Sequence, residues 1–174
     1  MTATATIPWD QLLTDIQKGA VLFISYASED KEAAFTLALG LHNAGIPVWL
    51  DKVRLQSGSD WETALRRAVK RRAALFISLI SAVTESFPEN PTTETQRFVM
   101  KERDWAADRH EPGLVFYVPA LINPGTKTQQ REPKIFRRLQ CAKLPGGQTN
   151  PAFIARIAAY MDEYREKGEI THVP

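Results

Sequence analysis

The chain is poor in the residues and runs that would place it outside a reducing, aqueous compartment. Cys141 is the only cysteine among 174 residues, so no internal disulfide forms. No apolar run approaches the roughly 20 residues that a membrane-spanning helix needs. The N-terminus, MTATATIPWDQ, lacks the basic and apolar regions of a signal peptide. We therefore expect a cytoplasmic protein without a membrane segment.

Other patterns are also missing. With 22 basic and 20 acidic residues, the net charge of +2 is too small to indicate nucleic-acid binding. No G-x-G-x-x-G follows the first predicted strand, which excludes a redox-type Rossmann domain. The three histidines are scattered and show no metal-ligand spacing: His42, His110 and His172.

One basic run remains, and it comprises Arg66, Arg67, Lys70, Arg71 and Arg72. The apolar residues Ala68 and Val69 interrupt it, and no aromatic residue is interleaved to stack on a base. We expect this run to be a solvated helix face and consider a nucleic-acid partner unlikely.

Apolar runs alternate with segments of helical periodicity along the chain. Strands are predicted at 20–26, 46–50, 73–80 and 114–122, and a short fifth one around 136–144. Alternating strands and helices indicate a parallel sheet with helices on both sides. We predict an α/β fold, a single flavodoxin-like doubly wound domain with a mainly parallel five-stranded sheet. It spans 20–167, after a 1–19 extension with a short amphipathic helix and before a 168–174 tail.

The second predicted strand leads into the most informative stretch. It ends on Asp51 and Lys52, and a polar loop containing Gly58 connects it to the next helix. Trp61 and Glu62 lie in the first turn of that helix, where its dipole keeps a carboxylate ionised. Ligands of such sheets bind beyond the carboxyl ends of the strands, so Glu62 is our candidate for catalysis.

A second carboxylate competes with this assignment. Glu102 lies on the stripe of a later helix that also carries Phe98 and Val99. We expect it to be partly buried and paired with an arginine such as Arg103 or Arg109. A structural role is favoured for Glu102, and it is the first rival to Glu62.

Several ordered segments together resemble a Toll/interleukin-1 receptor (TIR) domain of the bacterial type. They are FISYASEDKE (23–32), VWLDKVRLQSGSDWE (48–62), LFISLIS (75–81), KERDWA (101–106) and FYVPALI (116–122). The resemblance covers roughly 20–165. Some TIR domains are adaptors that only associate with other TIR domains, whereas others cleave NAD at the nicotinamide–ribose bond.

In the NAD-cleaving members the resemblance implies a catalytic glutamate in the helix after the second-strand loop. Matching through Leu55 and Gly58 assigns that role to Glu62. The same matching implies that further residues border the substrate: Tyr26 and Ala27 at the nucleotide, and Asp51, Lys52 and Trp61 at the ribose or nicotinamide.

The chemistry agrees with this resemblance. Nicotinamide leaves NAD as a neutral molecule, so the reaction needs no general acid and no metal. It needs one carboxylate that holds the ribose hydroxyls and stabilises an oxocarbenium-like centre. NAD is then the substrate, and no cofactor is expected.

We therefore expect an NAD glycohydrolase (NAD+ nucleosidase). Whether it also cyclises ADP-ribose into a signalling nucleotide, as in bacterial anti-phage immunity with a separate effector protein, stays open. One alternative is a non-enzymatic TIR–TIR interaction module. Another is an enzyme similar to nucleoside 2-deoxyribosyltransferases, which also use a glutamate at a glycosidic carbon.

The resemblance further implies self-association. The loop from Asp51 to Ser59 has only Val53 and Leu55 as apolar anchors, so we expect it to be mobile in a monomer and to become ordered at a contact between copies.

Overall fold

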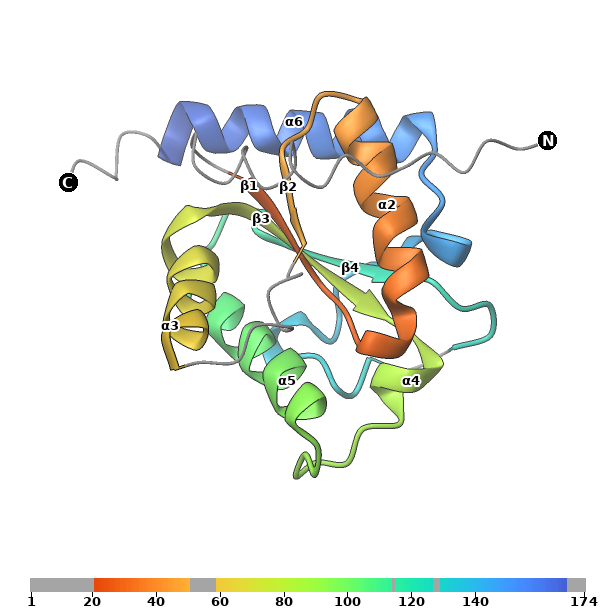
Figure 1. The fold of residues 1–174 in the computed structure, drawn as a ribbon. Helices are drawn as coiled ribbons and strands as arrows, with labels where there is room; N and C mark the ends of the chain where they lie inside the picture. Colours follow the sequence, from red (N-terminus) through yellow and green to blue (C-terminus); the bar gives the residue numbers. More distant parts are fainter. Residues whose placement is uncertain (1–20, 51–58, 114, 127–128, 169–174) are drawn as a thin grey trace.

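The computed structural model describes residues 21–50, 59–113, 115–126 and 129–168 (Figure 1). The predicted N-terminal helix and the last residues of the predicted tail lie outside this part of the chain, as do most residues of the second-strand loop.

Five parallel strands form the sheet. They are β1 (Val21–Ser25), β2 (Val48–Leu50), β3 (Ala73–Ile80), β4 (Tyr117–Leu121) and β5 (Ala142–Lys143). Their order is β2-β1-β3-β4-β5, and each pairs in parallel with its neighbours. The continuous apolar runs of β1 and β3 are buried along their whole length, as expected of central strands covered on both faces. The predicted doubly wound α/β fold is thus confirmed.

Two strands that contain or follow a proline are shorter than predicted. The second strand begins at Val48 and not at Ile46, although the Pro47 carbonyl still accepts from Leu22 N. The fourth is shorter than the predicted 114–122. β4 pairs with β3 along its whole length and with β5 from Ala120 onward. Pro119 therefore lies before the part of β4 that pairs with β5. A residue without an amide hydrogen is tolerated at such an edge position.

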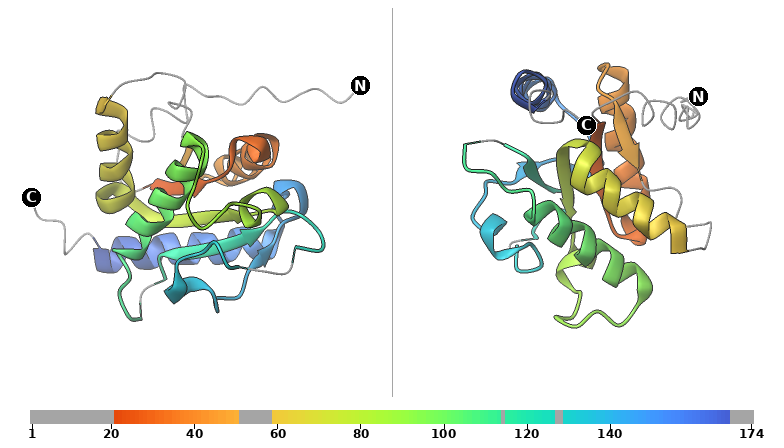
Figure 2. Two further views of the ribbon diagram at one scale, coloured as in Figure 1. Left: turned by 90° about the horizontal axis from the view of Figure 1, so that it is seen from below. Right: turned by 90° about the vertical axis from the view of Figure 1, so that its left-hand side faces the viewer.

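Two pairs of helices cover the two faces of the sheet (Figures 1 and 2). One face carries α2 (Lys31–Asn43) and α6 (Pro151–Gly168). The other carries α3 (Ser59–Arg67) and α5 (Glu94–Ala107). Each pair packs on its own hydrophobic core cluster. Leu37 and Leu41 are buried on the inner face of α2. Ala44 is exposed because the helix ends at Asn43.

Side-chain caps begin the elements after β3. Thr93 caps α5 and forms a capping box with Gln96. Between β3 and α5 lies a one-turn helix, α4 (Ala82–Glu85), which is capped by Ser81. The sequence pattern did not predict it, because four residues are too few to show helical periodicity.

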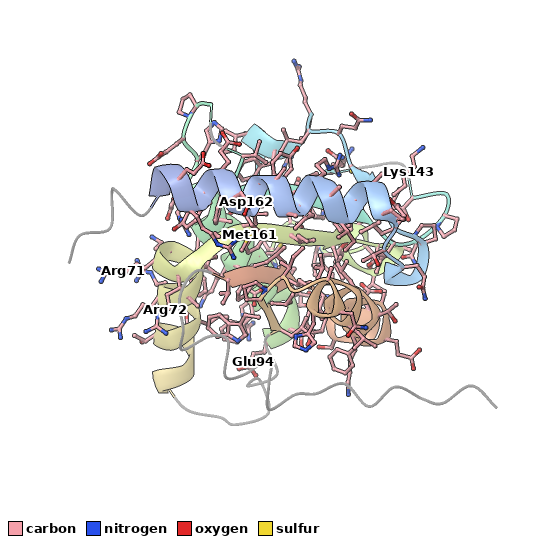
Figure 3. All side chains as sticks on the ribbon, turned by 90° about the horizontal axis from the view of Figure 1, so that it is seen from above. Arg71, Arg72, Glu94, Lys143, Met161 and Asp162 are labelled. Carbon is pink, nitrogen blue, oxygen red and sulfur yellow. The ribbon has the colours of Figure 1, made fainter. Side chains whose placement is uncertain are left out.

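The basic run lies at the end of α3, where the helix widens to a π-helix, η3 (Ala68–Arg72), that continues directly into β3. Its arginines are exposed, as expected of a solvated face. In Figure 3 Arg71 and Arg72 point away from the body of the protein. Arg109 Nη1 bonds the carbonyls of Val69 (2.9 Å) and Ala73 (2.5 Å) and thereby closes the turn. Among the described residues, no helix has the length and apolar character to cross a membrane.

Candidate active site

The connections of the sheet reverse direction between β1 and β3. From β1 the chain passes through α2 to β2 on one side, and from β3 it passes through α5 to β4 on the other. Ligands of doubly wound sheets bind in the crevice beyond the carboxyl ends of the strands at such a switch point. Polar residues are buried here despite the surrounding apolar core, namely Ser25, Asp30, Ser81 and Glu102.

Glu102 belongs to α5, and its carboxylate lies at the end of β1. Its side chain extends from α5 to Ser25, the last residue of that strand, whose Oγ donates to Glu102 Oε2 over 2.5 Å. Ser25 continues the alternation that places Phe23 on the α5 face, so strand geometry directs its hydroxyl toward this helix. Glu102 is 0 % exposed. A hydrogen bond to a buried carboxylate is strong and fixes its orientation.

The two arginines predicted as partners of Glu102 also bind other groups. Arg103 forms its ion pair with Glu132, with 3.3 Å between Nη1 and Oε1 and both side chains fully buried. Arg109 is occupied by the carbonyls of η3 and β3. Consecutive helix residues point about 100° apart, so Glu102 and Arg103 reach different strands. Glu132 was missed because nothing in the polar loop around it marks it as buried.

A second carboxylate, Asp30, bridges the two sides of the switch point. Ser81 Oγ donates to Asp30 Oδ2 over 2.5 Å, which ties the start of α2 to the end of β3. Burial raises the pKa of Asp30, and this outweighs the opposing effects of the Ser81 hydrogen bond and the charge of Arg103. Asp30 lies in the segment FISYASEDKE (23–32) and was not among the predicted site residues.

Glu62 lies on the outer side of this region. Its carboxylate pairs with Lys101 Nζ over 2.8 Å, and the side chains of Lys101 and Glu62 are 45 % and 41 % exposed. The pair connects α3 to α5 one residue before Glu102. The catalytic role of Glu62 stays a prediction.

Of the other predicted substrate residues, the structure describes the side chains of Tyr26 and Ala27, which belong to different clusters of buried residues. Tyr26 is 7 % exposed and packs in the core under α2 and α6, on the opposite face from Glu102. Ala27 is buried against Phe87 and Val99. The remaining predicted residues of the second-strand loop lie outside the described residues: Asp51, Lys52, Val53, Leu55 and Gly58. The side chain of Trp61 also lies outside them.

Other features offer no comparable chemistry. Within the described ranges, no three His, Cys, Asp or Glu side chains come together in a way that could hold a metal ion. A hollow of about 450 Å³ lies beside β5 and α6 and is lined by residues that include Lys143, Phe153 and Arg156, without a carboxylate.

Comparison with known proteins agrees with this architecture. The sequence model of the TIR domain matches residues 22–158. The chain belongs to the TIR domain family. No curated protein is significantly similar to this TIR domain in sequence.

Among solved structures, this TIR domain is similar to a metazoan TIR-STING receptor from C. gigas, determined in complex with 2′,3′-cGAMP. The similarity has a TM-score of 0.53 and 22 % sequence identity, and it covers 80 % of this chain. It covers 38 % of the receptor chain, so this TIR domain spans well under half of that protein. At this identity the comparison shows a shared fold.

Proposed function

We propose that this TIR domain cleaves NAD at the nicotinamide–ribose bond and that Glu62 is the carboxylate that stabilises the transition state. The observation that carries the proposal is the Glu62 carboxylate on α3, which is 41 % exposed and is held by Lys101 of α5 over 2.8 Å. Its exposure allows contact with a substrate, and an oriented carboxylate stabilises a developing positive charge.

In the proposed reaction the bond between ribose C1′ and the pyridinium nitrogen breaks. Its electron pair goes to that nitrogen, so nicotinamide leaves neutral and takes up no proton. The positive charge that develops at C1′ is stabilised by the carboxylate. Water captures C1′, loses a proton and gives ADP-ribose, whereas capture by a nucleophile of the same molecule gives a cyclic product. Mass spectrometry of the reaction mixture distinguishes the two products.

Glu102 is the competing candidate, and the two glutamates differ in surroundings. Glu102 is 0 % exposed and accepts a hydrogen bond from Ser25, which attaches α5 to β1. Glu62 is partly exposed beside Lys101. A catalytic carboxylate has to contact its substrate, so we prefer Glu62 over Glu102.

One observation favours a second function. Lys101 compensates the charge of Glu62 at 2.8 Å, and a compensated carboxylate stabilises a developing cation less well. A TIR domain that keeps this ion pair closed is a non-enzymatic interaction module. If self-association opens the pair, cleavage per molecule rises with protein concentration.

The test is nicotinamide release from NAD, followed by chromatography for the parent and for Glu102→Gln and Glu62→Gln. Loss of the Glu62 charge is expected to lower the rate on the order of a hundredfold or more while the domain stays folded. Loss of the Glu102 charge is expected to act through stability, because its hydrogen bond to Ser25 is buried. Normal cleavage by Glu62→Gln would contradict the assignment and make Glu102 the next candidate. A parent without turnover at high protein concentration would support the interaction module.

A further inference from the structure

The hollow beside β5 and α6 carries positive charge that the proposed cleavage of NAD does not use. It measures about 450 Å³ and opens between β5, the edge strand of the sheet, and the first turns of α6. Lys143 lines it from β5 and Arg156 lines it from α6. Figure 3 shows Lys143 beside the end of α6 at which this helix begins. Two cations from two separate elements thus meet at one hollow.

Neither of these cations is neutralised within the described part of the chain. Lys101 and Arg165 each have a carboxylate partner, at 2.8 Å and 3.2 Å, but the described residues provide none for Lys143 or Arg156. The recorded contact of Arg156 is with the ring of Phe153, whose centre lies 5.8 Å from the guanidinium carbon. A guanidinium over a ring face keeps its N–H donors available for an anion.

The other groups around the hollow also suit an anion. Asn150 lines it, and its Oδ1 accepts from the backbone N–H of Phe153 over 2.8 Å, so its free side-chain group is the donor Nδ2. No carboxylate is among the described residues that line the hollow. A phosphate group has the charge and the number of acceptor oxygens to bind an ammonium and a guanidinium together. Hollows of about 300–1,000 Å³ typically hold small organic molecules, so this one exceeds the size of a free phosphate.

We propose that this hollow binds a small organic phosphate of nucleotide size, with its phosphate group between Lys143 and Arg156. Apolar residues beneath the hollow, Leu144 and Phe153, belong to the core cluster under α2 and α6. Glu62 belongs to α3, on the other face of the sheet. The hollow is therefore a second site, and its ligand does not have to be a substrate.

The chain contains its own reporter for this site. Cys141 is the only cysteine, lines the hollow and is partly exposed. Burial raises the pKa of its thiol, and the charges of Glu132 and Glu85 raise it further. A phosphate bound in the hollow would cover the thiol and add another negative charge beside it. Both effects slow alkylation by a neutral reagent such as iodoacetamide, because the thiolate is the reactive form.

The experiment measures the alkylation rate of Cys141 by mass spectrometry of the folded protein, at constant ionic strength and about pH 8, near the usual thiol pKa. The probes are AMP, inorganic phosphate and adenosine. Saturating AMP is expected to slow alkylation by at least about fivefold, inorganic phosphate should do so only at higher concentrations, and adenosine should have no effect, since it lacks the charge. An alkylation rate unchanged by AMP and phosphate would overturn the proposal. Equal protection by adenosine would also overturn it, because the phosphate would then not be recognised.

Lys143→Gln and Arg156→Gln each remove one of the two cations. Each should raise the AMP concentration of half-maximal protection by about tenfold or more, the equivalent of one lost charge-assisted hydrogen bond. Arg138→Gln is the control, because Arg138 is exposed, does not line the hollow and changes the net charge equally. It should match the parent, and an equal loss in all three variants would show general attraction of anions and contradict a site.

A second readout is thermal unfolding. A ligand that binds only the folded state raises the melting temperature, so AMP should raise it in the parent and in Arg138→Gln but not in Lys143→Gln/Arg156→Gln. A rise of the same size in that double variant would refute the proposed ligands of the phosphate. None of these measurements requires NAD cleavage, so they decide this proposal whether or not the proposed function of Glu62 is correct.

Discussion

Two adjacent glycines in the turn before α6 provide a matched pair for a stability prediction. Gly146 and Gly147 have φ of +62° and +79°, in the left-handed region that side chains rarely adopt. They differ in their surroundings. A Cβ on Gly146 would meet nothing within 4 Å, whereas one on Gly147 would lie 2.0 Å from the carbonyl oxygen of Ala33 in α2. Gly147→Ala therefore adds a clash with helix backbone to a strain that both variants share.

The shared strain is about 1–2 kcal/mol, partly offset by the roughly 0.4–1 kcal/mol that alanine gains through a less flexible unfolded chain. The clash adds about 1–3 kcal/mol, because backbone cannot give way as a side-chain end does. Gly147→Ala is thus expected to lose about 2–4 kcal/mol and Gly146→Ala less than about 1.5 kcal/mol. For a domain of this size the first corresponds to a fall in melting temperature of roughly 4–16 °C.

Thermal unfolding followed by circular dichroism, with urea unfolding at 25 °C, measures both differences. The result that would refute this reasoning is an equal loss in the two variants. It would mean that the turn does not pack on α2 as closely as the Gly147 geometry requires.

Three further predictions follow from particular contacts. Burial raises the pKa of Asp30 in the folded state, so the native state holds a proton that the unfolded state has already lost. Asp30 therefore makes the free energy of unfolding fall as the pH rises from the unfolded pKa of about 3.9 through the raised value. Asp30→Asn should therefore gain stability relative to the parent between pH 4 and pH 7 in urea unfolding, and a constant difference would contradict the assignment. Arg109→Lys should lower the free energy of unfolding by about 1–3 kcal/mol. One ammonium does not replace a guanidinium that bonds two carbonyls and lies 4.2 Å from the centre of the Phe116 ring. An unchanged midpoint of urea unfolding would show that solvent satisfies those carbonyls. If self-association completes the site, specific activity should rise with protein concentration and fall in Leu55→Asp without loss of folding, whereas flat activity over about a hundredfold range would indicate a complete site in each chain.

The sequence predicted the fold well because the buried strands are nearly continuous apolar runs. The third strand, 73–80, is confirmed at both ends because charged residues precede it and the polar Ser81 follows it. The end of the second strand at Leu50 and the start of α5 after Thr93 are confirmed for similar reasons. Ends were wrong where apolar residues continue past the paired residues, as at Val115, Phe116 and Ile122 beside β4, since composition does not record pairing.

The candidate site was harder to predict because it depends on contacts between distant residues. Glu102 was noticed through its place on an apolar stripe, which correctly indicated burial. Its partner, Ser25, lies 77 residues away, and a small polar residue at the end of a strand carries no distinctive signal. Glu132 stands in a polar loop, where sequence reasoning assumes exposure. Periodicity shows which face of a helix is buried, but not which strand meets it.

The most direct test of the account compares Glu102→Gln with Glu62→Gln for nicotinamide release from NAD at the same protein concentration. The account predicts that Glu62→Gln releases nicotinamide more slowly than the parent by about a hundredfold or more, while it retains the parent's cooperative unfolding. Glu102→Gln is expected to lose stability first, because its buried hydrogen bond to Ser25 is weakened. Normal cleavage by folded Glu62→Gln, with loss of cleavage in folded Glu102→Gln, would contradict the account and assign catalysis to the carboxylate on α5.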